Sequence, residues 1–375
     1  MKTKTKIAFI VNDLGLGGVQ RLTIDFTRLL DKEKFETDVI LLLDKPNAQF
    51  YTDELASHIK KHSFIFKGVF DTKNWFKLQR LLRREKYDVV ITQLEFSDFI
   101  GRATAWLARV PVIMTIIQNL IPNSPIKQRL ADRFLAKVTD VCISPTAAIH
   151  EYAKKDIGFP ERKIIDIDTN GVDKERFETE LDKNKFRKEL NIPEQDTVVV
   201  NIGRLVEQKG QSVLIDAAKK ILEKQKDFSF VIVGDGKLED NLKKQAKELG
   251  IEQKVFFTGS RKDTPDILRS SDIFAFPSIW EGQGLILFEA IFSKIPIVAS
   301  NTGGIPDIIK DNETGVLVEP GNSDELAKIL MRVAEDKTLQ NKITSCIYER
   351  YKHRTLQNTV KALEEAIVKS LDETK

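Results

Sequence analysis

Short apolar runs alternate with amphipathic segments along most of the chain. Ile7–Val11 is an apolar run that ends in a glycine-rich turn, and the following segment places Val19, Leu22, Phe26 and Leu30 on one helical face. Short apolar runs bounded by turn residues are typical of buried strands, whereas apolar positions three and four residues apart indicate a helix. Strand–helix alternation predicts parallel sheets with helices on both faces.

The same alternation fills two halves of the chain. Further strands are predicted at Val39–Leu43, Asp88–Thr92, Val110–Thr115, Val141–Ser144 and Lys163–Ile167, then at Val198–Ile202, Phe228–Val233, Val255–Phe257, Ile273–Phe276 and Pro296–Ser300. Helices are predicted at Trp75–Arg84, Phe99–Leu107 and Ser212–Glu223. The pattern pauses in the charged stretch from Asp173 to Glu189. Because strand–helix–strand crossovers are right-handed, the economical fold is α/β with two doubly wound, Rossmann-like domains.

The predicted domains cover residues 1–175 and 176–352. A final helix within 353–375 carries no new strand and is expected to pack back on the N-terminal domain. The length of 375 residues agrees with two domains. In such sheets ligands bind beyond the carboxyl ends of the strands, so two domains of this kind are expected to face one interdomain cleft.

Composition and charge exclude several classes of protein. With 41% hydrophobic and 31% charged residues the chain has the composition of a soluble globular protein, and a formal net charge of +3 does not indicate nucleic acid as a partner. Cys142 and Cys346 lie in apolar surroundings and are expected to be buried free thiols. The histidines are scattered, and no spacing is typical of a metal site.

Lys and Arg recur between Lys67 and Arg109 and again between Lys127 and Lys137. A solvated surface explains this recurrence as well as a membrane-facing patch does. No apolar stretch approaches the roughly 18 to 20 residues that a membrane helix needs, and the start of the chain does not have the pattern of a signal peptide. The expected location is therefore the cytoplasm, at most at the inner face of the cell membrane.

Candidate binding residues follow the predicted strands. Gly17 and Gly18 open the first helix, where free N–H groups suit an anion, although such a turn is as often only structural. Gly203-Arg204 and Lys209 follow the first strand of the second half, and two cations suit a diphosphate leaving group as well as a solvent-facing loop. Gly234 and Ser260-Arg261 mark further turns that either line a nucleotide or only reverse the chain.

The most specific segment runs from Pro277 to Ala290. Glu281 lies in a loop with glycines at 282 and 284, and a helix is predicted to start near Leu285 with its N–H groups available to an anion. Glu289 lies inside that helix, which is apolar nearly all round and is therefore expected to be buried. A buried carboxylate needs partners, which favours a functional role for Glu289.

These residues resemble the retaining glycosyltransferases of family 4, which have the two-domain GT-B fold. The family's motif of Glu, seven residues and Glu corresponds to Glu281 and Glu289. The resemblance covers nearly the whole chain and is strongest from 200 to 320. Its other motifs are Gly17–Arg21, Asn170–Asp173 with Phe177, Gly203-Arg204 with Lys209-Gly210, Gly303–Asp307 and Thr314–Gly321.

The resemblance implies a role for each matching residue. Arg204 and Lys209 would neutralise the donor diphosphate, Glu281 would bind hydroxyls of the transferred sugar, and Glu289 would bind the ribose. The remaining donor contacts implied are Gly17, Gly18, Gly203, Gly234, Ser260, Arg261, Gly284, Leu285 and Ile286, with the backbone at 284–286 holding phosphate and the region of 260–261 touching the base. No cofactor and no metal are expected, because the cations and helix ends replace a metal.

One departure concerns the N-terminal half. Many family members have a His after the fifth strand, whereas this chain has Thr115-Ile116-Ile117-Gln118-Asn119 there. Gln118 or Asn119 is expected to contact the sugar instead. No side-chain general base is assigned, because the family's same-face mechanism lets the leaving phosphate accept the acceptor's proton.

The resemblance therefore implies metal-independent, retaining transfer of a hexose or N-acetylhexosamine. The donor is expected to be a UDP-sugar rather than GDP-mannose, and the acceptor a glycan or a polyprenyl-linked precursor of a polysaccharide. A sugar-nucleotide epimerase of the same fold is one alternative, although no suitable His cluster is present. A non-catalytic two-domain sugar-binding protein is the other. The sugar, the linkage and the oligomeric state stay open.

Overall fold

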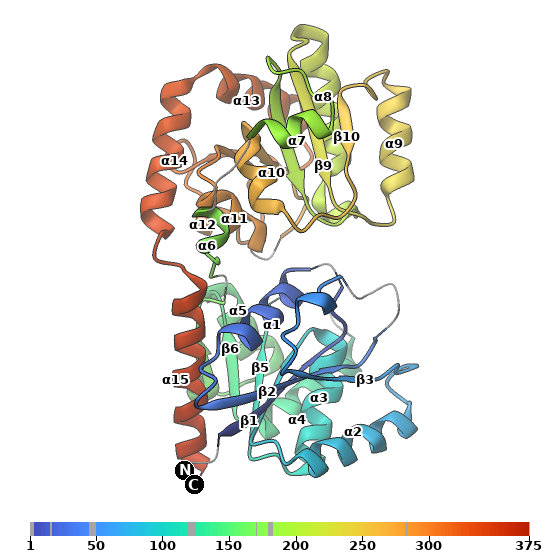
Figure 1. The fold of residues 1–375 in the computed structure, drawn as a ribbon, viewed down its shortest axis with the longest axis vertical. Coiled ribbons are helices and arrows are strands. Elements are labelled where there is room, and N and C mark those ends of the chain that lie inside the picture. Colours follow the sequence, from blue (N-terminus) through green and yellow to red (C-terminus); the bar gives the residue numbers. More distant parts are fainter. Residues whose placement is uncertain are drawn as a thin grey trace. The chain divides into compact units, whose positions relative to one another are not determined.

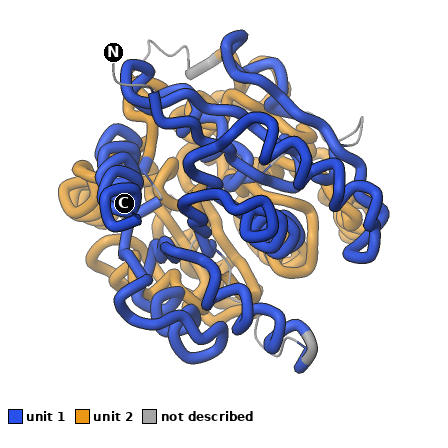
Figure 2. The backbone as a smooth tube through the Cα atoms, turned by 90° about the horizontal axis from the view of Figure 1, so that it is seen from below, with its two compact units in different colours: residues 1–171, 356–375 blue, residues 172–355 orange. Residues whose placement is uncertain are grey.

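The chain folds into two compact units, shown in different colours in Figure 2. The computed structural model describes residues 4–15, 17–44, 50–118, 125–169, 171–178, 183–281 and 284–374. Unit 1 comprises Met1–Gly171 together with Leu356–Lys375, and unit 2 comprises Val172–Thr355. The predicted boundaries after residues 175 and 352 lie close to these divisions.

The described residues of unit 1 form one parallel sheet in the order β3-β2-β1-β4-β5-β6-β7 (Figure 1). The strands are β1 (Thr5–Val11), β2 (Phe35–Leu41), β3 (Lys60–Ser63), β4 (Val89–Gln93), β5 (Val112–Ile116), β6 (Val141–Ser144) and β7 (Ile164–Asp166). The helices are α1 (Gly18–Leu29), α2 (Thr72–Glu85), α3 (Glu95–Ala108), α4 (Ile126–Val138), α5 (Ala147–Tyr152) and α15 (Leu356–Thr374). Short 3₁₀ helices lie at η1 (Thr52–Glu54) and η3 (Glu161–Lys163), and α5 continues into the π-helix η2 (Ala153–Ile157).

The central strand β1 shows how this sheet is covered on both faces. Its residues from Ile7 to Val11 are fully buried. Ile7 and Phe9 pack in one cluster with α1 and α15, whereas Ala8 and Ile10 pack in another with α2 and α3. Alternate residues of a strand point to opposite faces, so one continuous apolar run serves two helical layers. The sequence pattern of β1 follows directly from this double burial.

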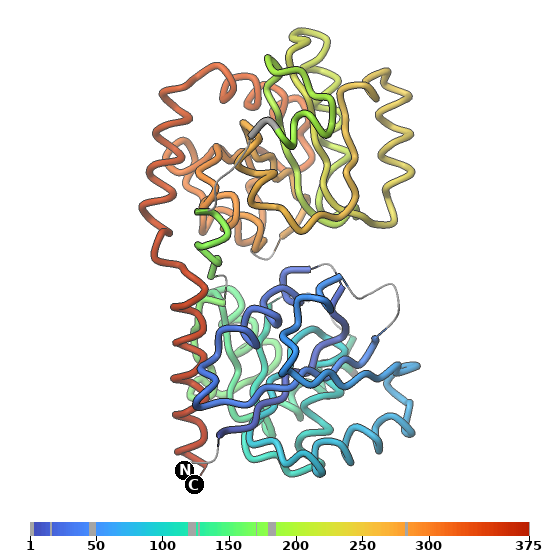
Figure 3. Tube along the Cα trace, in the orientation of Figure 1, coloured from blue at the N-terminus to red at the C-terminus, as the bar shows by residue number. Residues whose placement is uncertain are grey.

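The C-terminal helix α15 completes unit 1. Leu356, Val360, Leu363 and Ile367 lie at helical spacing and are buried against β1 and its neighbours. The chain therefore both starts and ends in unit 1, as the trace in Figure 3 shows. Burial of this apolar stripe explains why α15 packs on a sheet whose strands come from the other end of the sequence.

Unit 2 repeats the architecture with a parallel sheet in the order β10-β9-β8-β11-β12-β13. Its strands are β8 (Thr197–Ile202), β9 (Phe228–Val233), β10 (Val255–Phe257), β11 (Ile273–Phe276), β12 (Ile297–Ser300) and β13 (Val316–Val318). Its helices are α6 (Glu175–Glu178), α7 (Lys183–Glu189), α8 (Gln211–Lys224), α9 (Glu239–Glu248), α10 (Thr264–Ser270), α11 (Leu285–Phe292), α12 (Ile305–Ile308), α13 (Ser323–Glu335) and α14 (Lys337–Tyr351), with the turn η4 (Glu207–Lys209). Val198 and Val200 pack against α11, and Val199 packs against α8 and α13.

Two strands of the described chain were not predicted, and both lie at sheet edges. β3 reads Lys60-Lys61-His62-Ser63, pairs only with β2 and is mostly exposed, so it has no apolar run. β13 has three residues and follows Gly315. β13 is apolar throughout, but its three residues are too few to give the run of about four to eight apolar residues that marks a buried strand.

The prediction that both cysteines are buried was half wrong. Cys142 lies buried in β6, but Cys346 is exposed on α14. The apolar residue beside it, Ile347, is the one that packs into the core. None of the described helices is long and apolar enough to cross a membrane.

Candidate active site

The predicted donor-site residues of unit 2 lie in loops at one edge of its sheet. Gly203 and Lys209 follow β8, Gly234 follows β9, Ser260 follows β10, and Glu281 follows β11. Because all pairings in this sheet are parallel, these loops share the carboxyl edge. The topology therefore gathers residues that are far apart in the sequence.

Glycines let these loops pack backbone against backbone. A Cβ atom on Gly210 would lie 2.0 Å from the carbonyl oxygen of Pro277, and one on Gly303 would lie 1.8 Å from that of Glu281. A Cβ on Gly234 would lie 2.1 Å from the carbonyl oxygen of Gly203. All three have positive φ angles, of 65° at 210, 137° at 234 and 54° at 303. Any larger residue would push the loops apart.

An ion pair joins two of these loops. The Lys209 ammonium lies 2.5 Å from the Glu281 carboxylate, and the side chains are only 14% and 8% exposed. Lys209 also lies over the ring of Phe276, 5.3 Å from its centre. The Ser278 hydroxyl approaches the same carboxylate oxygen at 3.4 Å. Lys carries three N–H donors, so pairing with Glu281 leaves capacity for phosphate oxygens.

The loop before α11 ends at Gly284. This residue caps the helix with a φ of 69°, and a Cβ there would lie 2.7 Å from the ring of Phe276. The first N–H groups of a helix lack intrahelical partners and favour an anion. Leu285 and Ile286 form this first turn and are partly exposed. Gly282 and Gln283 lie outside the described residues.

Glu289 lies one turn further along α11. It was predicted to be buried because the helix is apolar, but it is half-buried on the same partly exposed face as Leu285 and Ile286. The opposite face of α11 packs into the core through Leu287, Phe288 and Ile291. The Thr264 hydroxyl donates to the Glu289 carboxylate at 2.7 Å. Glu289 therefore has one fixed partner and remains accessible at the loop edge.

Thr264 was not singled out from the sequence. It begins α10 directly before Pro265, a favourable first-turn residue, and this local signal marks a helix start without indicating the contact with Glu289. Twenty-five residues separate the two side chains, so only the fold brings them together.

Arg204 and Arg261 have different surroundings. Arg204 is exposed directly after β8, and its guanidinium makes no ion pair with any described residue. Arg261 donates to both oxygens of Asp263, at 2.8 and 2.7 Å, and to Glu189. These bonds hold the pKa values of the Asp263 and Glu189 carboxyls below their usual range. The Arg261 side chain is thus held by carboxylates, whereas Arg204 is available to a phosphate.

The neighbouring Ser260 links two loops. Its hydroxyl donates to Asp235 at 2.6 Å, which connects the loop after β10 to the loop after β9. Ser260 is therefore positioned at the carboxyl edge, and its predicted contact with the base stays a prediction.

In unit 1, Gly17 precedes α1, which begins at Gly18. The adjacent loop is ordered by Asp13, whose carboxylate accepts from the Gly15 N–H at 2.8 Å and from Gln20 at 3.2 Å. Gln118 follows β5, and its buried side-chain nitrogen has no hydrogen-bond partner among the described residues. Asn119, the second predicted sugar contact, lies outside the described residues.

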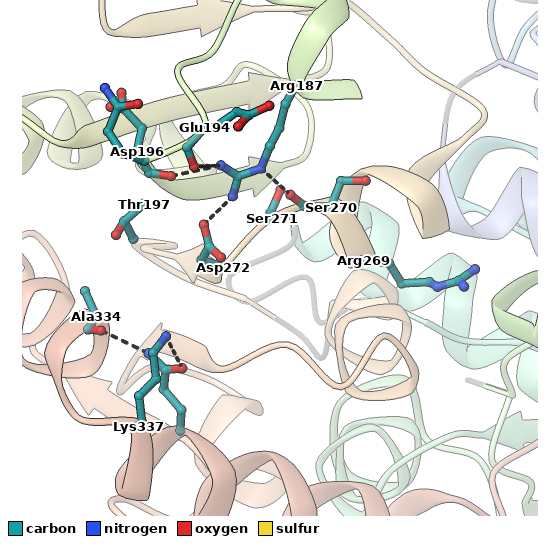
Figure 4. A pocket seen from close by; sticks show the side chains of 12 residues that line it. Arg187, Glu194, Asp196, Thr197, Arg269, Ser270, Ser271, Asp272, Ala334 and Lys337 are labelled. Atoms are coloured by element: carbon teal, nitrogen blue, oxygen red, sulfur yellow. Dashed lines mark hydrogen bonds and ion pairs between the residues drawn. The ribbon is translucent and has the colours of Figure 1, made fainter. Parts of the chain in front are cut away.

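A cavity of about 510 Å³ lies at the opposite, amino-terminal edge of the sheet of unit 2 (Figure 4). Thr197 at the start of β8 and Asp272 directly before β11 line it. The Arg187 guanidinium donates to Asp272 at 2.6 Å and to the Asp196 carbonyl at 2.9 Å. These bonds connect α7 to the segments that precede β8 and β11, and they pair the Arg187 charge with that of Asp272. Because the arginine is already paired here, whereas the predicted donor residues lie at the carboxyl edge, we place the reaction at the carboxyl edge.

The described residues contain no group of three or more His, Cys, Asp or Glu side chains placed to hold a metal ion. The expectation of metal-independent transfer stays a prediction.

Comparison with known proteins identifies the family. Residues 16–176 match the family described as Glycosyltransferase Family 4, and residues 182–350 match Glycosyl transferases group 1. The chain is 30% identical over 355 residues to the UDP-Gal:alpha-D-GlcNAc-diphosphoundecaprenol alpha-1,3-galactosyltransferase of Escherichia coli, covering 92% of each chain. It is 26% identical to the GalNAc-alpha-(1->4)-GalNAc-alpha-(1->3)-diNAcBac-PP-undecaprenol alpha-1,4-N-acetyl-D-galactosaminyltransferase of Campylobacter jejuni, covering 92% of this chain and 94% of that one.

The fold has solved counterparts. The structure of Anabaena Alr3699/HepE in complex with UDP and glucose superimposes with a TM-score of 0.84 at 22% identity, covering 97% of this chain and all of that chain. The chain therefore belongs to the group 1 glycosyltransferases of family 4, has the GT-B fold, and transfers a sugar from a nucleotide sugar.

Proposed function

We propose that this protein transfers a hexose or N-acetylhexosamine from a UDP-sugar to a glycan on a polyprenyl diphosphate, with retention and without a metal ion. The observation that carries this proposal is the Lys209–Glu281 pair, with 2.5 Å between nitrogen and oxygen. It sets a cation suited to diphosphate beside a carboxylate suited to sugar hydroxyls. Such a pair suits the point in a nucleotide-sugar donor where the diphosphate is joined to the sugar.

The charge that develops on the leaving diphosphate needs stabilisation. Lys209 supplies one cation, exposed Arg204 supplies a second, and the start of α11 supplies backbone N–H groups. Preorganised donors of this kind act where charge develops in the transition state. Together they would supply the neutralisation that a divalent metal provides in other transferases.

The reaction exchanges one bond at the anomeric carbon. The bond from C1 to the diphosphate oxygen breaks while the acceptor oxygen bonds to C1 from the same face. The acceptor's hydroxyl proton passes to a phosphate oxygen of the leaving UDP, so no side-chain base is required. Lys209 stabilises the leaving group, Glu281 orients the sugar, and Glu289 holds the ribose.

The donor and acceptor classes are supported by the relatives. The Escherichia coli relative is named for UDP-Gal and for an acceptor on diphosphoundecaprenol, and the Campylobacter jejuni relative is also named for an undecaprenol-linked acceptor. Both align with 92% of this chain. An acceptor with a polyprenyl tail resides in a membrane, so the protein would have to reach the membrane surface to use it.

The test is to incubate the purified protein with UDP-, GDP- and ADP-sugars, with and without a diphospholipid-linked GlcNAc, in the presence of EDTA. We expect UDP release from one UDP-hexose or UDP-N-acetylhexosamine, stimulated by the lipid-linked acceptor. NMR of the product should show the donor's anomeric configuration. Inverted product, release only from GDP- or ADP-sugars, or activity abolished by EDTA would each contradict the corresponding part of the proposal.

A further inference from the structure

Unit 1 exposes large apolar side chains on α2, α3 and α4. Phe76 is 70% exposed, Ile126 is 75% exposed, and Leu130 is 61% exposed. Trp106 and Phe134 are also about half exposed. Isolated exposed apolar residues are ordinary, but a group of them on adjacent helices marks an interaction surface.

Helix α4 carries the clearest pattern. Ile126, Leu130 and Phe134 are four residues apart and form one exposed stripe, and Arg129, Arg133 and Lys137 form a second at the same spacing. Every exposed side chain that the structure describes on α4 is apolar or cationic.

The single acidic residue of α4 is directed elsewhere. Asp132 lies 3.6 Å from the buried guanidinium of Arg102 in α3. Its negative charge therefore does not offset the exposed cations of this helix.

Helix α2 repeats this character. Phe76 is exposed together with Lys73, Lys77 and Arg80, and the helix holds five Lys or Arg residues against one Glu. That Glu85 accepts hydrogen bonds from Lys6 at 2.9 Å and from Arg84 at 3.0 Å. The negative charge of Glu85 is thus paired with cations of unit 1.

The three helices form one continuous surface, which we call the basic–apolar face. The rings of Trp106 and Phe134 lie edge to face, 5.5 Å apart, and join α3 to α4. Gln79 and Arg83 of α2 donate to the carbonyl of Leu107 in α3, at 3.0 and 2.8 Å. Right-handed crossovers from β3 to β6 place these helices on the same side of the sheet, opposite α1 and α15 (Figure 1).

We infer that the basic–apolar face docks unit 1 on the surface of an anionic lipid bilayer. Aromatic and aliphatic side chains enter the headgroup boundary, while Lys and Arg attract anionic headgroups. A second copy of the chain fits less well, because a twofold interface would set the same cations against one another. The inference rests on the proposed function, since a polyprenyl-linked acceptor lies at such a surface.

The position of α4 relates this face to the acceptor. α4 follows β5, and in a parallel sheet the helix after a strand begins near the carboxyl edge, where ligands bind. Ile126, the first residue of α4, therefore starts the apolar stripe near that edge. Docking through α4 would hold this edge close to an acceptor whose diphosphate sits at the membrane surface.

The experiment measures co-sedimentation of the full chain with phosphatidylcholine vesicles, with and without phosphatidylglycerol. We expect binding only to the anionic vesicles, weakened by salt. A cation near an anionic surface contributes a factor of about five, so the variant R129E/R133E/K137E should bind at least about a hundredfold more weakly. The matched control K243E/K244E/K247E changes three exposed lysines of α9 in unit 2 by the same net charge and should bind within about twofold of wild type.

The apolar stripe is tested separately by I126S/L130S, with Val368→Ser on exposed Val368 of α15 as its control. Of these two variants, only I126S/L130S should reduce binding to the anionic vesicles.

The inference is overturned if wild type does not bind anionic vesicles, if the α4 and α9 triple variants bind equally well, or if light scattering shows a dimer that I126S/L130S dissociates. UDP release without vesicles should persist in all these variants. Its absence in wild type would contradict the proposed function while leaving the docking result standing.

Discussion

The ammonium of Lys209 and the carboxylate of Glu281 lie 2.5 Å apart, although 72 residues separate them in the sequence. One follows β8 and the other follows the neighbouring strand β11, so the order of strands in the sheet makes the contact. A cation and an acceptor in direct contact are the chemical core of the proposed donor site.

Removing either member of this pair should greatly reduce sugar transfer. Lys209→Ala and Glu281→Gln should each lower the rate of UDP release at least about a hundredfold, as loss of a charge-stabilising group usually does. Lys219→Ala, which removes a lysine paired with Glu223 on the exposed side of α8, is the control and should leave the rate unchanged. Rates within tenfold of wild type in both site variants would rule out the assigned roles.

Gly210 should be intolerant of a side chain. Gly210→Ala would bring a Cβ atom to 2.0 Å from the Pro277 carbonyl and move the loop that carries Glu281. Gly250 has a similar φ of 68°, but a Cβ atom there would meet no described atom within 4 Å. Gly250→Ala should therefore cost only the left-handed strain of about 1–2 kcal/mol, whereas Gly210→Ala should cost more and also reduce activity. Urea unfolding and UDP release measured on both variants compare the two effects directly, and equal behaviour would refute the packing argument.

Arg187 should matter for stability and not for catalysis. Its guanidinium joins Asp272 and the Asp196 carbonyl at the edge of the sheet away from the donor loops. Arg187→Ala should lower the free energy of unfolding by about 2–3 kcal/mol, since a charged hydrogen-bond partner is lost. The rate of UDP release per folded molecule should stay within about twofold of wild type. A selective loss of activity would instead assign a catalytic function to the cavity in Figure 4.

Asp132 should make unit 1 sensitive to pH. Burial raises the pKa of its carboxyl to about 6, against 3.8 for the ordinary group. The folded state therefore holds the proton more tightly, so stability declines as pH rises from about 4 to 6 and the buried carboxyl ionises. Asp132→Asn mimics the protonated form, and its stability relative to wild type should increase over this range, by about 1–2 kcal/mol after solvent screening. Urea titrations at about pH 4 and about pH 7, at the two ends of the window set by these pKa values, measure this change. Exposed Asp156→Asn is the control, and a difference independent of pH would contradict the prediction.

The central strands and the division into two domains could be predicted, because a strand that is buried on both faces of its sheet needs a continuous run of apolar residues. Ile7–Val11 and Phe228–Val233 show this directly, since each is buried and lies between two neighbouring strands of its sheet. The edge strands β3 and β13 could not be predicted in this way, because β3 is mostly exposed and β13 is apolar but only three residues long.

The donor loops were predicted from motifs, but their contacts were not. Nothing local indicates that Lys209 meets Glu281 or that Thr264 meets Glu289. Glu289 was also predicted to be buried because α11 is almost entirely apolar, yet one face of this helix is partly exposed to solvent. Periodicity identifies residues that share a face, and only packing determines which face meets the core. For the same reason, the sequence alone could not show that the apolar stripe of α4 is exposed and does not face the core.

The most direct test of the central claim is UDP-dependent stabilisation of wild type and Lys209→Ala, followed by thermal unfolding. A nucleotide at 100 times its dissociation constant adds about 2.7 kcal/mol to the native state. We predict that UDP raises the Tm of wild type more than GDP or ADP does, and that Lys209→Ala, compared with its own Tm in the absence of nucleotide, loses most of the increase. An equal increase in wild type and Lys209→Ala, or none with any nucleotide, would contradict the account.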